Sequence, residues 1–416
     1  MKLQILDLRS CSYPHNLFSQ IDLTSDGEPT LVTPLRPQLA ALDIELVVLP
    51  IDQIDLNQPW IVSVLVTAWT WRTHLSGVFT HGWDDRIIQG LTHGHARVIL
   101  NHQQENHTAN FFEPFYNKFL IWDKSIPADR ITYWCGGSNV VDIHTKWVKD
   151  NHIPLDRQIN VGYVNHGFRR FFDHNIKFFT HKNLPKIKKY LCLNRHTRFD
   201  HRLLLVSLLA QAECINNAWV SLGIVSEQAK LNAEINILTW SELFGPELEA
   251  GWAKIRHRLP LQIDTVDLTQ NHASTNSLSA DYYHQSCFSV VTSTTALKED
   301  EESISFTEKE FKAILAHHPF ILVNRPRALK SLRDQGYLTF TPWFNEDYDL
   351  ETDDVVRLKL IVAEVKRLSE LSWDEWAVIL REMQPVLEHN WHRLTMGFSD
   401  QCYYNSDLKE LIKLAR

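Results

Sequence analysis

The sequence predicts an α/β protein with two domains, and three observations support this prediction. Short apolar runs, typical of strands, alternate along most of the chain with stretches that have helical periodicity. Several of these runs are continuous in Val, Ile and Leu, as in parallel strands that are buried on both faces. The length of 416 residues is too great for one ordinary core and fits two domains of about 200 residues each.

The first half of the chain carries the pattern of a parallel sheet. Its longest apolar stretches, residues 44–51 and 60–69, are about half the length needed to span a bilayer and are expected to be buried strands. The first residues lack the apolar run and the cleavage site of a signal peptide, and we expect a strand there. The strands expected in this half cover residues 3–8, 44–49, 61–65, 98–100, 119–121 and 161–164.

The second half repeats the pattern after a polar, basic segment, residues 181–189. We therefore expect an N-terminal domain over residues 1–185 and a C-terminal domain over residues 186–416, with substrates between them at the carboxyl ends of the strands. From Asp353 onward apolar residues recur every three or four positions, which predicts helices. The remaining expected elements are strands at 190–193, 219–221, 288–291 and 320–323, and helices at 373–391 and 406–414.

Composition and charge exclude several classes of protein. The chain is 44% hydrophobic and 22% charged, which excludes disordered, collagen-like and low-complexity proteins. The 42 Lys and Arg against 50 Asp and Glu give a formal net charge of −8, which disfavours a whole-chain affinity for DNA or anionic membranes. The six cysteines contain no C-x-x-C pair and are expected to be reduced, mostly buried thiols of a cytoplasmic protein.

The segment of residues 306–340 is the most informative part of the sequence. Thr307 is expected to cap a helix of about ten residues that a buried strand and a second helix follow. Glu308 and Lys309 would then stand at a helix start, where free N–H groups and the helix dipole favour an anion. They could hold hydroxyls and a phosphate, or they could be a capping acid beside a surface lysine.

A second cluster of polar residues follows the expected strand at 190–193. Asn194, Arg195, Arg198 and Arg202 stand at a turn from this strand into an apolar helix. Guanidinium groups pair with phosphate oxygens through two hydrogen bonds, so the cluster is suited to a diphosphate. The alternative is that the arginines belong to a solvated helix face.

These two segments resemble known glycosyltransferases. The order Phe306-Thr307-Glu308-Lys309, a helix and then a strand resembles the sugar-nucleotide site of the α1,3-fucosyltransferases, in which a Thr-Glu-Lys tripeptide opens a helix. The Asn194 segment resembles the start of that family's second domain, where arginines follow a strand that ends in Asn. Residues 190–348 are also similar to phage and bacterial glycosyltransferase-like proteins with an FTEK segment and an upstream NR-x-x-R segment.

The resemblance implies a GT-B fold, in which two Rossmann-like domains face each other and the C-terminal domain binds a nucleotide-diphosphate sugar. Lys309 with Arg198 or Arg202 would neutralise the leaving diphosphate, so no metal ion or other cofactor would be needed. Glu308 would bind hydroxyls of the donor. Tyr348 and Asp349 could close the nucleotide pocket.

An inverting transferase also needs a general base near the acceptor hydroxyl. We expect the base in loops of the N-terminal domain, with Glu105 as the first candidate because it follows the expected strand at 98–100. Asp84 and Asp85 are the other candidates, and each of these acids could instead be a solvated loop residue.

Two further patterns suggest metal sites, and we favour neither. Asp347-Tyr348-Asp349 matches the D-x-D pattern of the other major glycosyltransferase fold, but short acidic triplets are common. His93 and His95 have the spacing of strand-type zinc ligands, but no further ligand stands at a convincing spacing.

The sequence therefore predicts an inverting, metal-independent glycosyltransferase with a glycan or another hydroxyl compound as acceptor. One alternative is a non-catalytic nucleotide- or sugar-binding protein on the same scaffold. A second alternative keeps the chemistry but uses modified bases of DNA as acceptor, bound along a basic groove. The groove would be formed by Lys182, Lys186, Lys188 and Lys189.

Overall fold

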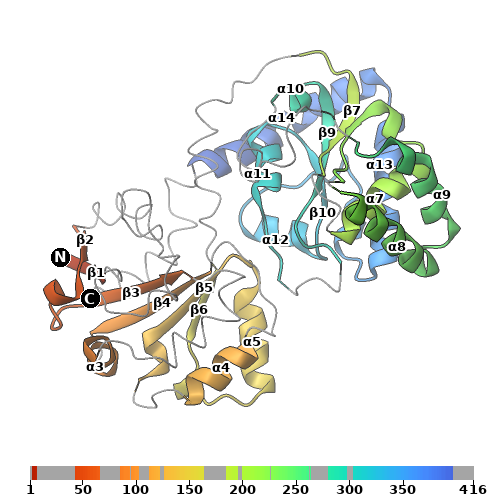
Figure 1. The fold of residues 1–416 in the computed structure, drawn as a ribbon. Coiled ribbons are helices and arrows are strands. Elements are labelled where there is room, and N and C mark those ends of the chain that lie inside the picture. Colours follow the sequence, from red (N-terminus) through yellow and green to blue (C-terminus); the bar gives the residue numbers. More distant parts are fainter. Residues whose placement is uncertain are drawn as a thin grey trace. The chain divides into compact units, whose positions relative to one another are not determined.

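A computed structural model describes the chain in a series of segments that contain two α/β units (Figure 1). Each unit is described by itself below. The described residues are 2–6, 43–65, 85–93, 95–102, 112–121, 126–163, 184–194, 199–224, 226–261, 263, 280–297 and 303–396.

The first unit contains a parallel sheet in the order β2-β1-β3-β4-β5-β6. This confirms the parallel sheet that the sequence predicts. Its strands are β1 (Lys2–Leu6), β2 (Glu45–Leu49), β3 (Trp60–Leu65), β4 (Ala96–His102), β5 (Ile131–Cys135) and β6 (Asn160–Tyr163). Its helices are α3 (Asp85–His93), α4 (Phe112–Ile121) and α5 (Val140–Asp150), with 3-10 turns η3 (Ile51–Gln53), η5 (Ala128–Arg130) and η6 (Leu155–Arg157).

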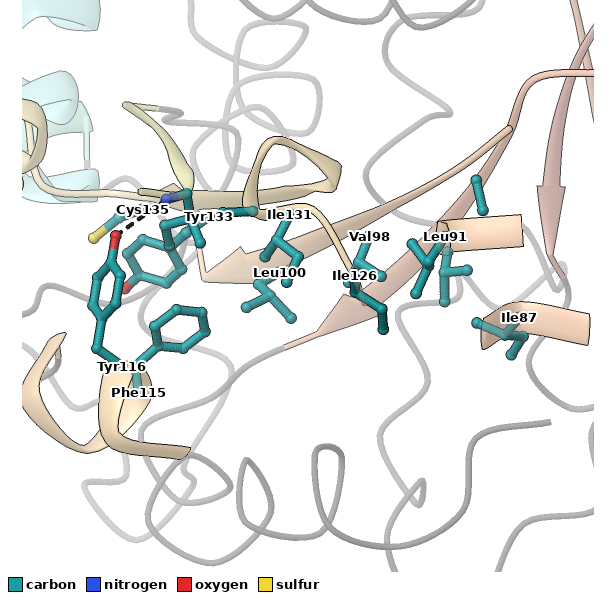
Figure 2. Packing of buried hydrophobic residues seen from close by; sticks show 14 of the residues in the cluster. Ile87, Leu91, Val98, Leu100, Phe115, Tyr116, Ile126, Ile131, Tyr133 and Cys135 are labelled. Carbon is teal, nitrogen blue, oxygen red and sulfur yellow. Dashed lines mark hydrogen bonds between the residues drawn. The ribbon is translucent and has the colours of Figure 1, made fainter. Parts of the chain in front are cut away.

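The core of the first unit lies between the sheet and its helices. Figure 2 shows Val98 and Leu100 of β4 and Tyr133 of β5 among the side chains of this cluster. Leu91 of α3 and Phe115 of α4 complete the packing, and all five side chains are buried. Burial on this scale explains why parallel strands of this kind are rich in branched and aromatic residues.

Two strand assignments in the first unit need correction. Residues 119–121, predicted as a strand, form the last turn of α4. A short apolar run fits a buried strand and a helix end equally well, and Phe112, Phe115 and Tyr116 supply the helical spacing that decides it. The sequence analysis also missed β5, which is buried throughout its length.

The second unit contains a parallel sheet in the order β10-β9-β7-β8, again as predicted. Its strands are β7 (Lys188–Cys192), β8 (Ala218–Val220), β9 (Ser286–Thr292) and β10 (Phe320–Val323). Its longer helices are α7 (Asp200–Gln211), α8 (Glu227–Phe244), α9 (Pro246–Ile255), α13 (Asp354–Glu370) and α14 (Trp373–Met396). The shorter helices and turns are α10 (Ala280–His284), α11 (Glu308–Leu315), α12 (Ala328–Asp334), η7 (Ile215–Asn217), η8 (Arg256–Arg258) and η9 (Asp347–Asp349).

Local signals set the ends of several of these helices. The Asp353 side chain accepts hydrogen bonds from the N–H groups of Val355 and Val356, both at 2.9 Å, and so begins α13 where the sequence predicts. Gly336 has φ +85 and follows the end of α12, a conformation that favours glycine. α7 and α9 pack so closely that a Cβ on Gly251 would lie 2.0 Å from the carbonyl oxygen of Ser207.

The two units divide the described chain near the predicted boundary. Residues up to Tyr163 belong to the first unit and the described residues from 184 to 297 and from 304 to 396 to the second. The boundary after residue 185 stays a prediction, because residues 164–183 lie outside the described residues. Within the described part of the chain, every helix is too short or too polar to cross a membrane.

Candidate functional site

Asn194 and Arg202, two of the polar residues singled out in the second half of the sequence, lie at the carboxyl edge of the second sheet. All four strands are parallel, so their carboxyl ends share this edge. Thr292 Oγ1 donates a hydrogen bond to Asn194 Oδ1 at 2.6 Å, and the Asn194 N–H donates to Ser221 Oγ at 3.0 Å. The ends of β9, β7 and β8 are thereby joined, and the side chain of Asn194 is buried in this network.

Ser293, the residue after β9, is the centre of the network. Its carbonyl oxygen accepts from Nε2 of His201 at 3.0 Å and from Nη2 of Arg202 at 3.1 Å. Its hydroxyl donates to Oε1 of Glu310 and accepts from Nδ2 of Asn324 at 2.8 Å. Ser293 therefore connects the start of α7, the start of α11 and the end of β10.

The first turn of α7 holds the buried side chain of Arg202 at this edge in a fixed orientation. Asp200 accepts from Nδ2 of Asn236 at 2.6 Å and from Nε1 of Trp240 at 3.0 Å, which ties the turn to α8. The Arg202 guanidinium lies over the ring of Phe199, 4.7 Å from its centroid. Arg195 and Arg198, the other predicted phosphate ligands, lie outside the described residues.

The start of α11 has the predicted N-cap, extended into a capping box. Lys309 N–H donates to Thr307 Oγ1 at 3.4 Å, and the Thr307 N–H donates to Oε2 of Glu310 at 2.7 Å. The Thr307 hydroxyl donates to the same carboxylate oxygen at 2.9 Å. Thr307 and Glu310 therefore fix the first turn that carries Glu308 and Lys309.

Glu308 and Lys309 form an ion pair in a half-buried position. Lys309 Nζ lies 2.9 Å from Glu308 Oε1, and the two side chains are 27% and 17% exposed. Burial alone would raise the pKa of Glu308, but Lys309 and Lys312 outweigh burial and hold that pKa below its ordinary value. An ionised acceptor and a cation thus stand together at a helix N-terminus.

The buried His201 lies among the cations of this edge. Burial, with smaller effects of Arg202, Lys309 and Arg357, lowers the pKa of His201 to about 3, and its bond to Ser293 acts in the opposite direction. His201 is therefore neutral at physiological pH. Arg202 bonds to Ser293, whose hydroxyl bonds to Glu310 in the helical turn that carries Lys309. That Lys309 and Arg202 share one ligand stays a prediction.

Arg357 is a residue of this region that the sequence analysis missed. It lies on α13, is 2% exposed, and donates to the carbonyl oxygen of Ala296 and to Oδ1 of Asp354. The periodicity of α13 predicts the helix, but it holds no signal that this arginine reaches the loop after β9.

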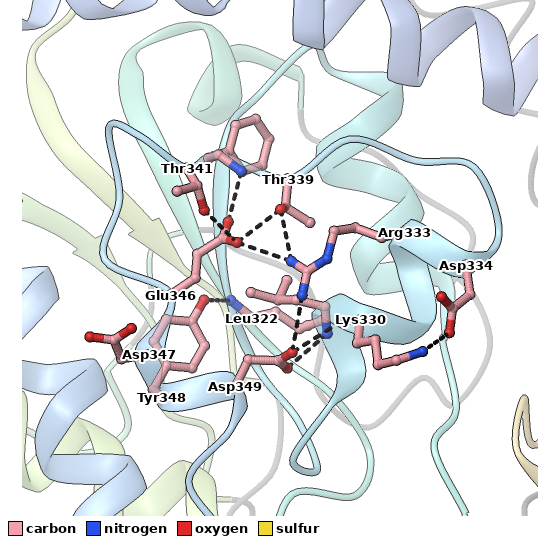
Figure 3. Close-up of polar contacts among 12 residues, drawn as sticks. Leu322, Lys330, Arg333, Asp334, Thr339, Thr341, Glu346, Asp347, Tyr348 and Asp349 are labelled. Carbon is pink, nitrogen blue, oxygen red and sulfur yellow. Dashed lines mark hydrogen bonds and ion pairs between the residues drawn. The ribbon is translucent and has the colours of Figure 1, made fainter.

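Tyr348 and Asp349 make structural contacts with β10 and α12 (Figure 3). The Tyr348 hydroxyl accepts from the N–H of Leu322 in β10 at 3.3 Å, and its ring is buried. The Asp349 carboxylate accepts from the N–H groups of Leu329 and Lys330 at 2.8 and 3.0 Å and so caps α12. A role of Tyr348 in closing a nucleotide pocket stays a prediction.

Neither of the two metal patterns forms a set of metal ligands in the described part of the chain. Asp347 is exposed, whereas both carboxylate oxygens of Asp349 accept backbone N–H groups, so the two acids do not face a common point. No group of three or more His, Cys, Asp or Glu residues suited to a metal ion occurs among the described residues, which include His93 and His95.

One lysine of the basic groove considered for a DNA acceptor is buried. Lys189 is buried, its Nζ donates to the carbonyl oxygen of Leu371, and it lies 3.8 Å from the ring centroid of Trp373. Lys188 donates to the carbonyl oxygen of Asn216 at 3.1 Å, and Lys182 lies outside the described residues. These contacts turn Lys189 into the protein rather than toward a phosphate backbone.

Of the general-base candidates in the first unit, the structure describes Asp85. This residue begins α3 and is exposed. Glu105 and Asp84 lie outside the described residues. β4, which precedes Glu105, ends at His102, a buried residue whose Nδ1 lies 2.9 Å from the Tyr133 hydroxyl.

No protein-family model and no curated protein matches the chain. Among solved structures the chain is similar to the DNA-modifying enzyme β-glucosyltransferase, whose structure is known with and without uridine diphosphoglucose. The two share 11% sequence identity and a TM-score of 0.42, and the match covers 99% of this chain and 100% of that chain. The chain is also similar to the trehalose-6-phosphate synthase OtsA (11%, TM-score 0.43, 97% and 84% of the two chains) and to the pneumococcal O-GlcNAc transferase GtfA (10%, TM-score 0.41, 86% and 58%).

Proposed function

We propose that the protein is a glycosyltransferase that moves a sugar from a nucleotide-diphosphate sugar to a hydroxyl acceptor. The observation that carries this proposal is the Glu308–Lys309 pair at the capped start of α11, joined to Arg202 at the carboxyl edge of a parallel sheet. Parallel α/β sheets bind ligands outside the carboxyl ends of their strands. A helix start with cations beside it favours a phosphate group.

The proposed reaction is an inverting displacement. The acceptor oxygen bonds to the anomeric carbon as the bond from that carbon to the diphosphate breaks, and the diphosphate leaves with the electron pair. Lys309 and Arg202 stabilise the negative charge that develops on the diphosphate, which is where fixed cations contribute most. Glu308 accepts hydrogen bonds from donor hydroxyls, and a base in the first unit, Glu105, takes the acceptor proton.

The proposal includes a GT-B arrangement, with residues 1–185 on the acceptor side and residues 186–416 on the donor side. The acceptor is a glycan or another hydroxyl compound. We include a cytoplasmic location, which the free, buried thiols of Cys192, Cys214 and Cys287 support.

Thermal unfolding with a panel of nucleotide sugars tests the proposal. A donor at a hundred times its dissociation constant should stabilise the protein by about 2.7 kcal/mol. Transfer is then followed as release of the nucleoside diphosphate with candidate acceptors. Absence of stabilisation by every nucleotide sugar would contradict the proposal, whereas binding without transfer to any acceptor would favour the non-catalytic binding protein.

Transfer is expected to be independent of divalent metal ions. The positive charge of Lys309 and Arg202 takes the place that a metal ion holds in other transferases, and Asp349 is committed to capping α12. Activity in excess EDTA should equal activity with added Mn²⁺. Loss of activity with EDTA and recovery with Mn²⁺ would show that the diphosphate needs a metal ion.

Binding of the diphosphate is expected to take up protons near pH 8.5. Burial, with a smaller effect of Lys309, lowers the pKa of Lys312 to about 8, although Glu308 raises it. Lys312 is then partly neutral above pH 8, and a nearby anion favours its charged form, so its pKa rises on binding.

Calorimetry at pH 8.5 in buffers of different ionisation enthalpy measures this proton uptake. At pH 6.5 Lys312 is protonated in both states, so the uptake should disappear. The Lys312→Met variant should show none at either pH, and an unchanged uptake in that variant would assign the protons to another group.

A further inference from the structure

The bond between Ser293 and Glu310 is more than a helix cap requires. A capping box needs one carboxylate bond, from the Thr307 N–H to Oε2 of Glu310 at 2.7 Å, and the same oxygen also accepts from the Thr307 hydroxyl at 2.9 Å. The second oxygen, Oε1, accepts from the hydroxyl of Ser293 at the end of β9. The start of α11 is therefore tied to the sheet through one carboxylate.

A second capping box in the same unit provides the comparison. Glu375 at the start of α14 accepts from the N–H and the hydroxyl of Ser372, both at 2.7 Å. The Glu375 N–H donates back to the Ser372 hydroxyl at 3.2 Å. Among the described residues Glu375 makes no hydrogen bond to a strand end, so this box caps a helix without positioning it on the sheet.

The carboxylate of Glu310 is fully buried, which is unfavourable without strong partners. Burial raises the pKa of Glu310, while the hydroxyl of Ser293, the charge of Lys309 and the N–H of Thr307 act in the opposite direction. The polar contacts hold the carboxylate in one place. Ser293 meanwhile holds Arg202 through its carbonyl oxygen at 3.1 Å.

One residue therefore fixes both halves of the cation site. The carbonyl oxygen of Ser293 orients Arg202, and its hydroxyl orients Glu310, which fixes the turn with Lys309. Two cations can together bind the two linked phosphates of a diphosphate, whereas a monophosphate has fewer charged oxygens to share between them.

We propose that Ser293 and Glu310 are positioning residues that set the separation of Arg202 and Lys309 and so make the site selective for a diphosphate over a monophosphate. This inference rests on the proposed function. Glu310 acts through Lys309 and does not touch the ligand itself.

Calorimetric binding of uridine and guanosine diphosphates and monophosphates tests the inference. The comparison uses the nucleoside that the wild-type protein binds. Glu310→Gln should lower the affinity for its diphosphate about 10-fold and the affinity for its monophosphate less than about 2-fold, because a hydrogen bond to a charged group is lost at the turn that carries Lys309. Glu375→Gln, the matched control, should change neither affinity, although both variants lower thermal stability. Equal weakening of both nucleotides by Glu310→Gln would overturn the selectivity.

The double variant shows whether Glu310 acts through Lys309. In the Lys309→Ala background, Glu310→Gln should weaken diphosphate binding less than about 2-fold, because the group that it positions is absent. A further 10-fold loss in that background would show that Glu310 acts by another route.

Hydrogen exchange separates this inference from the proposed function, because it needs no ligand. Ser293→Ala removes the hydroxyl that donates a hydrogen bond to the Glu310 carboxylate. That carboxylate accepts the hydrogen bond of the Thr307 amide, so hydrogen exchange at this amide should accelerate. Exchange at the start of α14 should be unchanged. Unaltered exchange at Thr307 in Ser293→Ala would overturn the positioning role. If exchange at Thr307 accelerates in that variant but the wild-type protein binds no nucleotide, the positioning role stands. The proposed function and the diphosphate selectivity are then overturned.

Discussion

Replacing Lys309 by alanine is expected to lower kcat/KM for the nucleotide sugar by roughly 30- to 1000-fold, equivalent to about 2–4 kcal/mol of transition-state stabilisation. Lys309 is the cation at the start of α11, and it is fixed there by its bonds to Thr307 and Glu308. The charge on the leaving diphosphate grows in the transition state, so the loss should fall more on kcat than on KM. Steady-state kinetics with the donor found by the thermal screen measures the effect.

Two further variants make the Lys309 prediction specific. Lys309→Arg keeps the positive charge and should retain part of the activity, since a guanidinium also binds phosphate. Lys359→Ala removes an ion pair of similar length, 2.8 Å to Glu247, from another part of the second unit and should leave kcat unchanged. If Lys309→Ala has wild-type kcat, the leaving group is stabilised elsewhere.

The features that the sequence predicts well are those that neighbouring residues determine. Thr307 begins α11 and Asp353 begins α13 because each side chain bonds to N–H groups two or three residues ahead. The periodicity of apolar residues likewise predicts α14. For the same reason residue type and spacing alone are enough to place Glu308 and Lys309 at a helix start.

The features that the sequence does not show depend on contacts between distant residues. Arg357 reaches the loop after β9, and Ser293 joins α7, α11 and β10, although no spacing in the sequence relates them. Asp349 has the sequence pattern of one half of a metal motif but caps α12, which lies before it in the chain. Such partners are chosen by the fold, so residue type and spacing could not identify them.

The strands likewise include some that neighbouring residues predict and one that depends on contacts between distant residues. β10 is an unbroken apolar run and β7 contains one after its first two lysines, and both are predicted within about two residues of their ends. β5 includes a threonine and two large aromatic residues, and its burial comes from β4 and β6 on either side of it. Its β-branched and aromatic residues were the signal that could have identified it.

The second large effect is expected from Glu105→Gln, which should lower turnover by about 10²- to 10⁴-fold and leave donor binding intact. β4 ends at the buried His102, so Glu105 follows the carboxyl end of a central strand by three positions. Loops at that edge of an α/β sheet carry ligand-binding groups. Glutamine keeps the size and the hydrogen bonding of glutamate but cannot accept the acceptor proton.

The Asp85→Asn variant shows whether the loss of turnover is specific to the carboxylate of Glu105. Asp85 is exposed at the start of α3, where an acid stabilises the helix dipole whether or not it has a catalytic role. Asp85→Asn should therefore lower thermal stability slightly and leave turnover within about 3-fold of wild type if Glu105 is the base. Near-normal turnover in Glu105→Gln together with a large loss in Asp85→Asn would move the base to the start of α3, where Asp84 precedes Asp85 in the sequence.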